Sequence, residues 1–259
     1  MPVVLVEKQT PQITIITLNR PERRNSLTIE LMEELTAAIE NANSDPSQRI
    51  LILRGAGAGF CTGLDLNEAA ETEKAHASAN MVAKTLIAVS QTRLVTMALV
   101  HGAALAGGAG IMAACDFVIA AEGTKIGFPE VRRGLVAGLV MTFLRRQVRE
   151  RDLRELLFMS ELIDAKRANE IGLVNRVVPS DQLDATAKKI IAAVLQGAPG
   201  ALTNSKRLME ELWSSSVVKD VEHALQHHVQ ARESAEAKEG IAAFLEKRAP
   251  KWASEPDRL

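Results

Sequence analysis

The sequence predicts an α/β fold in which helices cover a largely buried sheet and a helical region follows. In the first half, β-rich runs alternate with helical patterns, and after about residue 135 the strand signals nearly stop. Hydrophobic residues make up 47% of the 259 residues, which is enough for a sizeable core without disulfide bonds. Strands that alternate with helices need crossover connections, which favour parallel, buried strands.

Four strands are expected where β-branched and apolar residues cluster, at 13–18, 50–53, 95–100 and 117–120. Between the first two strands, apolar residues at helical spacing predict a helix that begins after Thr28, a suitable N-cap, and ends near Asn43. Its buried face should carry Leu31, Leu35, Ala38, Ile39 and Ala42.

The second half is predicted to be helical at 142–147, 153–159, 165–170, 182–195, 202–212 and 217–245, with a break in the last stretch. Ala198-Pro199-Gly200 is the best boundary signal. We therefore expect a core at 1–197 and a helical region at 198–259. Apolar positions in that region need a surface to pack on, which favours subunit association.

Composition excludes several classes of partner. The net charge is −1, so no overall field attracts nucleic acid or an anionic membrane, and the chain has no Tyr for stacking on bases. No apolar run reaches bilayer length, and the N-terminus lacks the pattern of a signal peptide. Cys61 and Cys115 have no metal-ligand spacing, which indicates packing residues in a reducing compartment. We expect a cytoplasmic protein without a metal site.

Two glycine-rich turns each follow a predicted strand, at 55–66 and at 102–110. If the strands are neighbours, the turns lie at the same sheet edge, where two backbone N–H groups can converge on one oxygen as an oxyanion hole. The alternative is a pair of tight turns in a buried layer. A dinucleotide fingerprint is disfavoured because Phe60 stands where the third glycine is needed, and neither turn has the Gly-Lys-Ser/Thr of a P-loop.

An ordered set of short motifs resembles the enoyl-CoA hydratase/isomerase, or crotonase, family over nearly the whole chain. The motifs are Asn19-Arg20-Pro21, Asn25-Ser26-Leu27, 60–66 (FCTGLDL), Gly107-Gly108, Cys115-Asp116, 127–130 (GFPE), Gly134-Leu135, Ala168 with 171–174 (IGLV), and 244–248 (FLEKR). No single motif is specific, but their order is.

The resemblance implies a spiral of ββα turns and a C-terminal helical region that builds trimers or hexamers. It also implies an acyl-CoA thioester substrate with no separate cofactor. Carried onto this sequence, the oxyanion-hole donors are the N–H groups of Leu64 and Gly107. The substrate-binding positions that match are Ser26, Leu64, Asp65, Leu66 and Asn67. Charge attraction to the CoA phosphates adds Arg24 and Lys247, the latter from a neighbouring subunit; the alternative is that both are solvated surface residues.

The resemblance leaves the reaction open. Hydratases of the family commonly use two glutamates; the second matches Glu130, a candidate general acid/base, whereas the first falls on Gly110, a vacant second-acid position. The main prediction is a 2-enoyl-CoA hydratase of fatty-acid or branched acyl-CoA metabolism. The alternatives are a Δ3-Δ2-enoyl-CoA isomerase that uses Glu130 alone, and a non-catalytic CoA-ester or RNA-binding member of the family.

Overall fold

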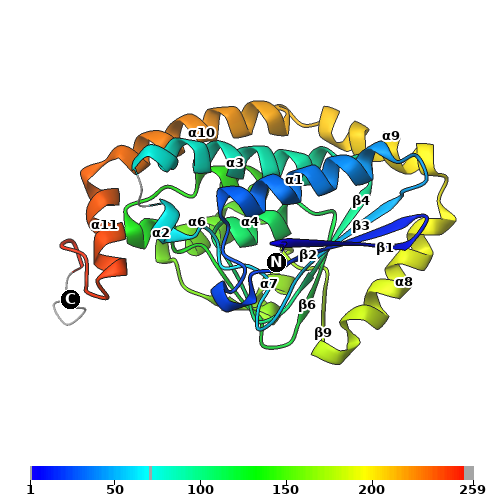
Figure 1. Ribbon diagram of the computed structural model, residues 1–259, viewed down its shortest axis with the longest axis horizontal. Helices are drawn as coiled ribbons and strands as arrows, with labels where there is room; N and C mark the ends of the chain where they lie inside the picture. Colours follow the sequence, from blue (N-terminus) through cyan, green and yellow to red (C-terminus); the bar gives the residue numbers. More distant parts are fainter. Residues whose placement is uncertain (1, 70–71, 254–259) are drawn as a thin grey trace.

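The chain folds around a six-stranded sheet that is covered by helices on both faces (Figure 1). The computed structural model describes residues 2–69 and 72–253. The strand order is β1-β2-β3-β4-β6-β9, and every pairing is parallel except β1 with β2. The strands are β1 (Val4–Thr10), β2 (Ile13–Leu18), β3 (Ile50–Gly55), β4 (Val95–Val100), β6 (Phe117–Ala121) and β9 (Arg176–Val178).

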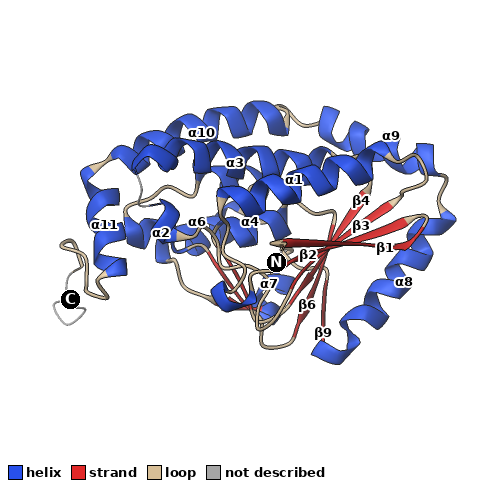
Figure 2. Cartoon of the chain, viewed as in Figure 1, coloured by secondary structure: helices blue, strands red, loops and turns tan. Residues whose placement is uncertain are grey.

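A second, small sheet has the order β5-β7-β8, from β5 (Ala103–Leu105), β7 (Lys125–Gly127) and β8 (Ile163–Asp164). The helices are α1 (Ile29–Ser44), α2 (Leu66–Ala69), α3 (Thr72–Gln91), α4 (Gly107–Ala113), α5 (Gly138–Leu144), α6 (Glu150–Arg154), α7 (Ala165–Glu170), α8 (Leu183–Gln196), α9 (Pro199–Glu211), α10 (Val217–Glu233) and α11 (Ala235–Leu245). Short 3-10 turns lie at Pro21–Arg23, Pro129–Arg133 and Ser180–Gln182, and a π-turn at Glu155–Met159. The predicted α/β class with a helical C-terminal region is confirmed (Figure 2).

The alternation of side chains along the strands divides the core into two layers. In β3, Leu51 and Leu53 face the larger layer, which α1, α3 and α4 share. Ile50 and Ile52 face the smaller layer, which is closed by α8. Because both faces are covered, the strand reads as one continuous apolar run.

The predicted elements differ from the observed ones in a few places. Thr28 does cap α1, since its Oγ1 accepts from the N–H of Leu31 at 3.2 Å. The expected helix at 142–147 begins earlier and ends earlier, as α5, and the one at 153–159 turns from α6 into the π-turn. Helix α3 and the strands β1, β5, β7, β8 and β9 were not predicted. Strand β1 is an exposed edge strand with one buried residue, and the other four strands are two or three residues long.

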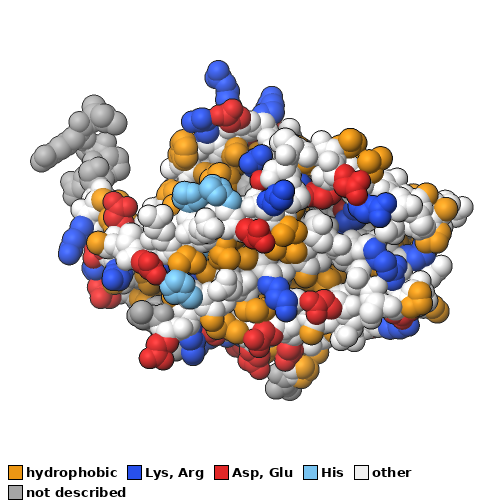
Figure 3. Space-filling model, turned by 90° about the horizontal axis from the view of Figure 1, so that it is seen from above, with side chains coloured by type: hydrophobic (Ala, Val, Ile, Leu, Met, Phe, Trp, Pro, Cys, Tyr) orange, Lys and Arg blue, Asp and Glu red, His pale blue; other side chains and the backbone are white. Residues whose placement is uncertain are grey.

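The C-terminal region does not depend on a partner for all of its packing. Val217 and Val221 of α10 are buried in the larger core layer of the same chain, and α10 lies against α3 and α5. Other apolar side chains there remain exposed: Leu208, Met209, Leu212, Trp213 and Phe244. Apolar side chains are also visible among charged ones on the face formed by the long helices (Figure 3).

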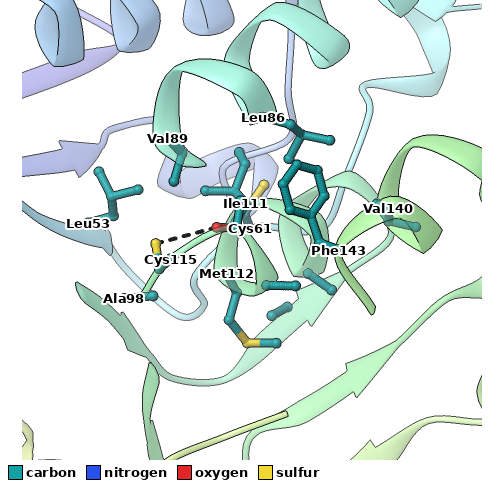
Figure 4. Close-up of a cluster of buried hydrophobic side chains, with 14 of the residues drawn as sticks. Leu53, Cys61, Leu86, Val89, Ala98, Ile111, Met112, Cys115, Val140 and Phe143 are labelled. Carbon is teal, nitrogen blue, oxygen red and sulfur yellow. Dashed lines mark hydrogen bonds between the residues drawn. The ribbon is translucent and has the colours of Figure 1, made fainter. Parts of the chain in front are cut away.

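Both cysteines are packing residues, as expected. Cys61 and Cys115 are free and buried, and Cys115 lies in the apolar cluster with Ile111, whose carbonyl accepts from its Sγ at 3.4 Å (Figure 4). Burial raises the pKa of each thiol to about 12, so neither forms a thiolate near neutral pH. None of the described helices combines the length and apolar character that a membrane span requires.

Candidate active site

The two glycine-rich turns lie against each other, as the sequence analysis expected. Cys61 pairs with the β5 strand: its N–H donates to Ala103 at 3.1 Å and its carbonyl accepts from Leu105 at 2.9 Å. A Cβ placed on Gly108 would collide with the carbonyl of Cys61. The close approach of the two backbones therefore requires glycine at this position.

The side chain of Asn25 holds the first glycine-rich turn in place through hydrogen bonds. It is fully buried, and its amide nitrogen donates to the carbonyls of Ala56 at 2.9 Å and Gly59 at 2.8 Å. Its Oδ1 accepts from the backbone N–H of Arg20 at 2.8 Å. One side chain thus ties the segment before α1 to the turn after β3.

The turns bring the two expected oxyanion donors to one place. A Cβ on Gly63, which has a φ of +84°, would lie 3.4 Å from the nitrogen of Gly107. Gly107 is the first residue of α4, so its N–H has no partner within the helix. In the part of the chain that the structure describes, the N–H groups of Leu64 and Gly107 donate to no protein acceptor.

The backbone before Gly107 is strained. Ala106 has a φ of 48° and a ψ of −125°, a conformation that costs a residue with a side chain on the order of 1–3 kcal/mol. Leu64, Ala106 and Gly107 all line a cavity of about 520 Å³. Two unpaired donors at a cavity wall can stabilise an oxygen that gains negative charge.

Glu130 lines the same cavity from the 3-10 turn that Pro129 begins. Its side chain is buried and Oε2 has no hydrogen-bond partner among the described residues. Burial raises the pKa of Glu130 to about 7, against smaller lowering effects of a backbone hydrogen bond and of Arg133. Near neutral pH the carboxyl group can therefore both take up and release a proton.

The other predicted substrate-binding residues fall into two groups. Arg24, Ser26, Asp65, Leu66 and Asn67 line the cavity, as does Leu64. Lys247 is exposed and is not among the residues that line it. Within one chain it does not reach the site, so its contact with a substrate stays a prediction about a neighbouring subunit.

Asp65 is held by protein partners. Its Oδ2 accepts from Arg20 at 3.1 Å and from Ser26 at 3.2 Å. Burial alone would raise the pKa of Asp65, but the hydrogen bond and charge of Arg20 outweigh it, so the pKa lies below its usual range. This ion pair holds the turn that carries Leu64 in place. Asp65 therefore has a positioning role, because Arg20 and Ser26 already occupy its Oδ2.

Gly110 does not leave an open space. A Cβ at this position would overlap Cγ1 of Val140 and lie 3.5 Å from Cδ2 of Leu86. Gly110 provides no acid, as the sequence indicates, and the space beside it is filled by Val140, an apolar side chain of α5 that also lines the cavity. Glu130 is the one buried carboxylate among the described lining residues.

Several lining residues carried no clear signal in the sequence. Arg133 lies three residues after Glu130, and its guanidinium stacks over the ring of Phe244 at 4.4 Å. His228, buried in α10, and Leu245 line the cavity from the C-terminal region. Their helical spacing gave no sign of the cavity, because the cavity depends on how α10 and α11 fold back over the loop at 130–137.

In the described residues no three His, Cys, Asp or Glu side chains are grouped closely enough to hold a metal ion.

Known proteins resemble this chain over nearly its whole length. The family model for enoyl-CoA hydratase/isomerase matches residues 8–255. The chain is 33% identical over 254 residues to a mevalonyl-coenzyme A hydratase of Aspergillus fumigatus, covering 96% of this chain and 94% of that protein. It is 32% identical over 256 residues to a crotonyl-CoA hydratase of Syntrophomonas wolfei, covering 95% of each. The crystal structure of an enoyl-CoA hydratase from Mycobacterium avium superposes with a TM-score of 0.85 at 30% identity, covering 98% of this chain and 100% of that one.

The packing at Gly110 can be tested by stability. Gly110→Ala should lower the free energy of unfolding by about 1–3 kcal/mol through overpacking against Val140, although alanine is otherwise the better helix former. In a Val140→Ala background the same change should be neutral or stabilising. Denaturant unfolding of the four proteins of this cycle measures the coupling. Equal effects of Gly110→Ala in both backgrounds would contradict the contact.

Proposed function

Because the chain belongs to the enoyl-CoA hydratase/isomerase family, we propose that it is a 2-enoyl-CoA hydratase in which Glu130 moves the proton. The observation that carries the proposal is that a buried carboxyl group and two unpaired backbone N–H groups line one cavity. In this proposal, Leu64 and Gly107 donate to the thioester oxygen, and Arg24, Ser26 and the segment 64–67 hold the CoA part. The family reaction needs no further cofactor.

The proposed reaction adds water across the double bond with a single acid/base group. Glu130 as carboxylate takes a proton from water while the water oxygen bonds to C3. Negative charge then passes through C2 to the thioester oxygen, where the two N–H groups stabilise it more than in the ground state. Glu130 returns its proton to C2. Each such donor contributes on the order of 3 kcal/mol in other oxyanion holes.

An isomerase is the second candidate, and the filled position at Gly110 favours it. Gly110 supplies no second acid and Val140 fills the space beside it, so Glu130 is the one buried carboxyl group at the described cavity wall. A Δ3-Δ2-enoyl-CoA isomerase needs one such group, which takes a proton from C2 and returns it to C4. The same cavity without turnover would suit a non-catalytic CoA-ester-binding member of the family.

The assembly and location expected from the sequence also stay proposals. Exposed apolar side chains such as Phe158, Leu162 and Leu212 support a trimer or hexamer, since contact between subunits would cover them. In such an assembly residues 198–259 form the association region beside a core of residues 1–197, and Lys247 reaches the phosphates of a neighbouring site. A cytoplasmic location remains the prediction from the free cysteines.

Glu130→Gln tests the proposed role directly. The variant should lose turnover by about a hundredfold or more, because it cannot take or give a proton, and it should still bind CoA thioesters. Loss of the 2-enoyl absorbance indicates hydration, and its appearance from a 3-enoyl thioester indicates isomerisation. Val131→Ala, an exposed neighbour, is the matched control. Undiminished turnover in Glu130→Gln would contradict the role, and no turnover by the unaltered protein would favour the non-catalytic alternative.

The raised pKa of Glu130 predicts the pH dependence. The carboxylate is the form that starts either reaction, so kcat/KM should be level above pH 7 and fall about tenfold per unit below the pKa of about 7. A carboxyl group with an ordinary pKa would keep kcat/KM level down to about pH 5. A flat profile between pH 5 and 8, with the fold intact by circular dichroism, would show that Glu130 is not desolvated in this way.

A further inference from the structure

His228 is a second buried, unpaired polar side chain of the cavity, and the proposed reaction does not use it. It lies in α10, is 7% exposed, and lines the cavity together with Glu130. The loop from 130 to 136 connects the two residues. The N–H of Leu135 donates to the carbonyl of Glu130 at 3.0 Å. The carbonyl of the following residue, Val136, contacts His228.

The contact with Val136 determines what the other ring nitrogen can do. Nδ1 of His228 lies 3.1 Å from the carbonyl oxygen of Val136. A carbonyl oxygen can only accept, so Nδ1 carries the proton. Burial lowers the pKa of His228, and the charge of Arg232 lowers it further against the raising effect of the Val136 hydrogen bond. The ring is therefore neutral, and Nε2 carries a lone pair and no proton.

Nε2 of His228 has no hydrogen-bond partner within the described residues. Leaving a buried acceptor unpaired costs free energy. Leu139 and Val140, which line the same cavity, are apolar and offer no donor. A bound molecule with an O–H group can supply this donor in place of water.

Arg133 limits which chemical group of a ligand can pair with His228. Its Nε is buried and unpaired, and the residue lines the same cavity, so it offers a hydrogen-bond donor. A hydroxyl group can donate to His228 and accept from Arg133. A carboxylate would set negative charge against the lone pair of Nε2, and a hydrocarbon chain would leave both nitrogens unpaired.

We propose that His228 is a specificity-determining residue that accepts a hydrogen bond from a hydroxyl group on the acyl chain beyond C3. The site then prefers a hydroxylated acyl thioester to a hydrocarbon one of equal length. This inference rests on the proposed function in one respect, that the cavity binds an acyl-CoA thioester.

Binding can be measured without turnover in the Glu130→Gln background. The probes are trans-2-hexenoyl-CoA and its 4-hydroxy, 5-hydroxy and 6-hydroxy derivatives, whose trans double bond keeps the hydroxyl group from closing onto the thioester. Calorimetry should give at least one hydroxylated probe a dissociation constant about tenfold or more below that of the plain probe. Equal affinity for all four probes would overturn the proposal, as expected if water alone pairs with Nε2.

Two substitutions at His228 separate recognition from a structural role. The amide nitrogen of His228→Asn takes the place of Nδ1 and can still donate to Val136, but nothing stands at Nε2. The amide oxygen of His228→Gln reaches the position of Nε2 and can still accept. Recognition predicts that the hydroxyl preference is lost in His228→Asn and kept in His228→Gln, with little change for plain hexenoyl-CoA. The reverse pattern would assign His228 to holding the loop and overturn the proposal.

The outcomes distinguish this inference from the proposed function. If the unaltered protein hydrates no enoyl-CoA but the hydroxyl preference is measured, the hydratase fails and the inference stands. If hydration occurs and no probe is preferred, the inference fails and the hydratase stands. If none of the four thioesters binds, both fail.

Discussion

The close approach of two backbone turns is the constraint on which the site depends. The turn after β3 and the first turn of α4 touch through Cys61 and Gly108, where a side chain on the glycine would collide with a carbonyl. This contact brings the N–H groups of Leu64 and Gly107 to one cavity wall and leaves both without a protein acceptor. Asn25 and the Arg20–Asp65 ion pair hold the first turn, and parallel strands carry both turns to the same region. Packing thus fixes the donors before any ligand binds, which is what preorganised electrostatic stabilisation requires.

Burial gives the remaining groups of the cavity their chemistry. Glu130 loses solvent without gaining a partner for Oε2, so its pKa rises toward neutrality. His228 stays neutral for the same reason, and its contact with Val136 selects the tautomer. Buried polar atoms without a partner are costly, and groups whose pKa is shifted by burial are common at functional sites. A ligand with matching groups would recover this free energy by pairing with them.

The sequence predicted those parts of the site that lie in local patterns. Glycines directly after strands indicated the paired turns, and Pro129-Glu130 matched a family motif, so both could be found without coordinates. The sequence shows that Gly110 provides no second acid, but only the packing of α5 shows that Val140 fills the space beside it. Arg133 and His228 were missed for a related reason. Their place at the cavity depends on how the last two helices fold back, and helical periodicity records burial without saying what the buried face meets.

The central claim is that the thioester oxygen lies between the N–H groups of Leu64 and Gly107. A crystal structure of the protein with an unreactive acyl-CoA thioester tests it most directly. The account predicts the thioester oxygen within about 3.2 Å of both backbone nitrogens, with the C2 and C3 carbons next to the Glu130 carboxyl group. A thioester bound in the same cavity with its oxygen hydrogen-bonded to neither nitrogen would contradict the account.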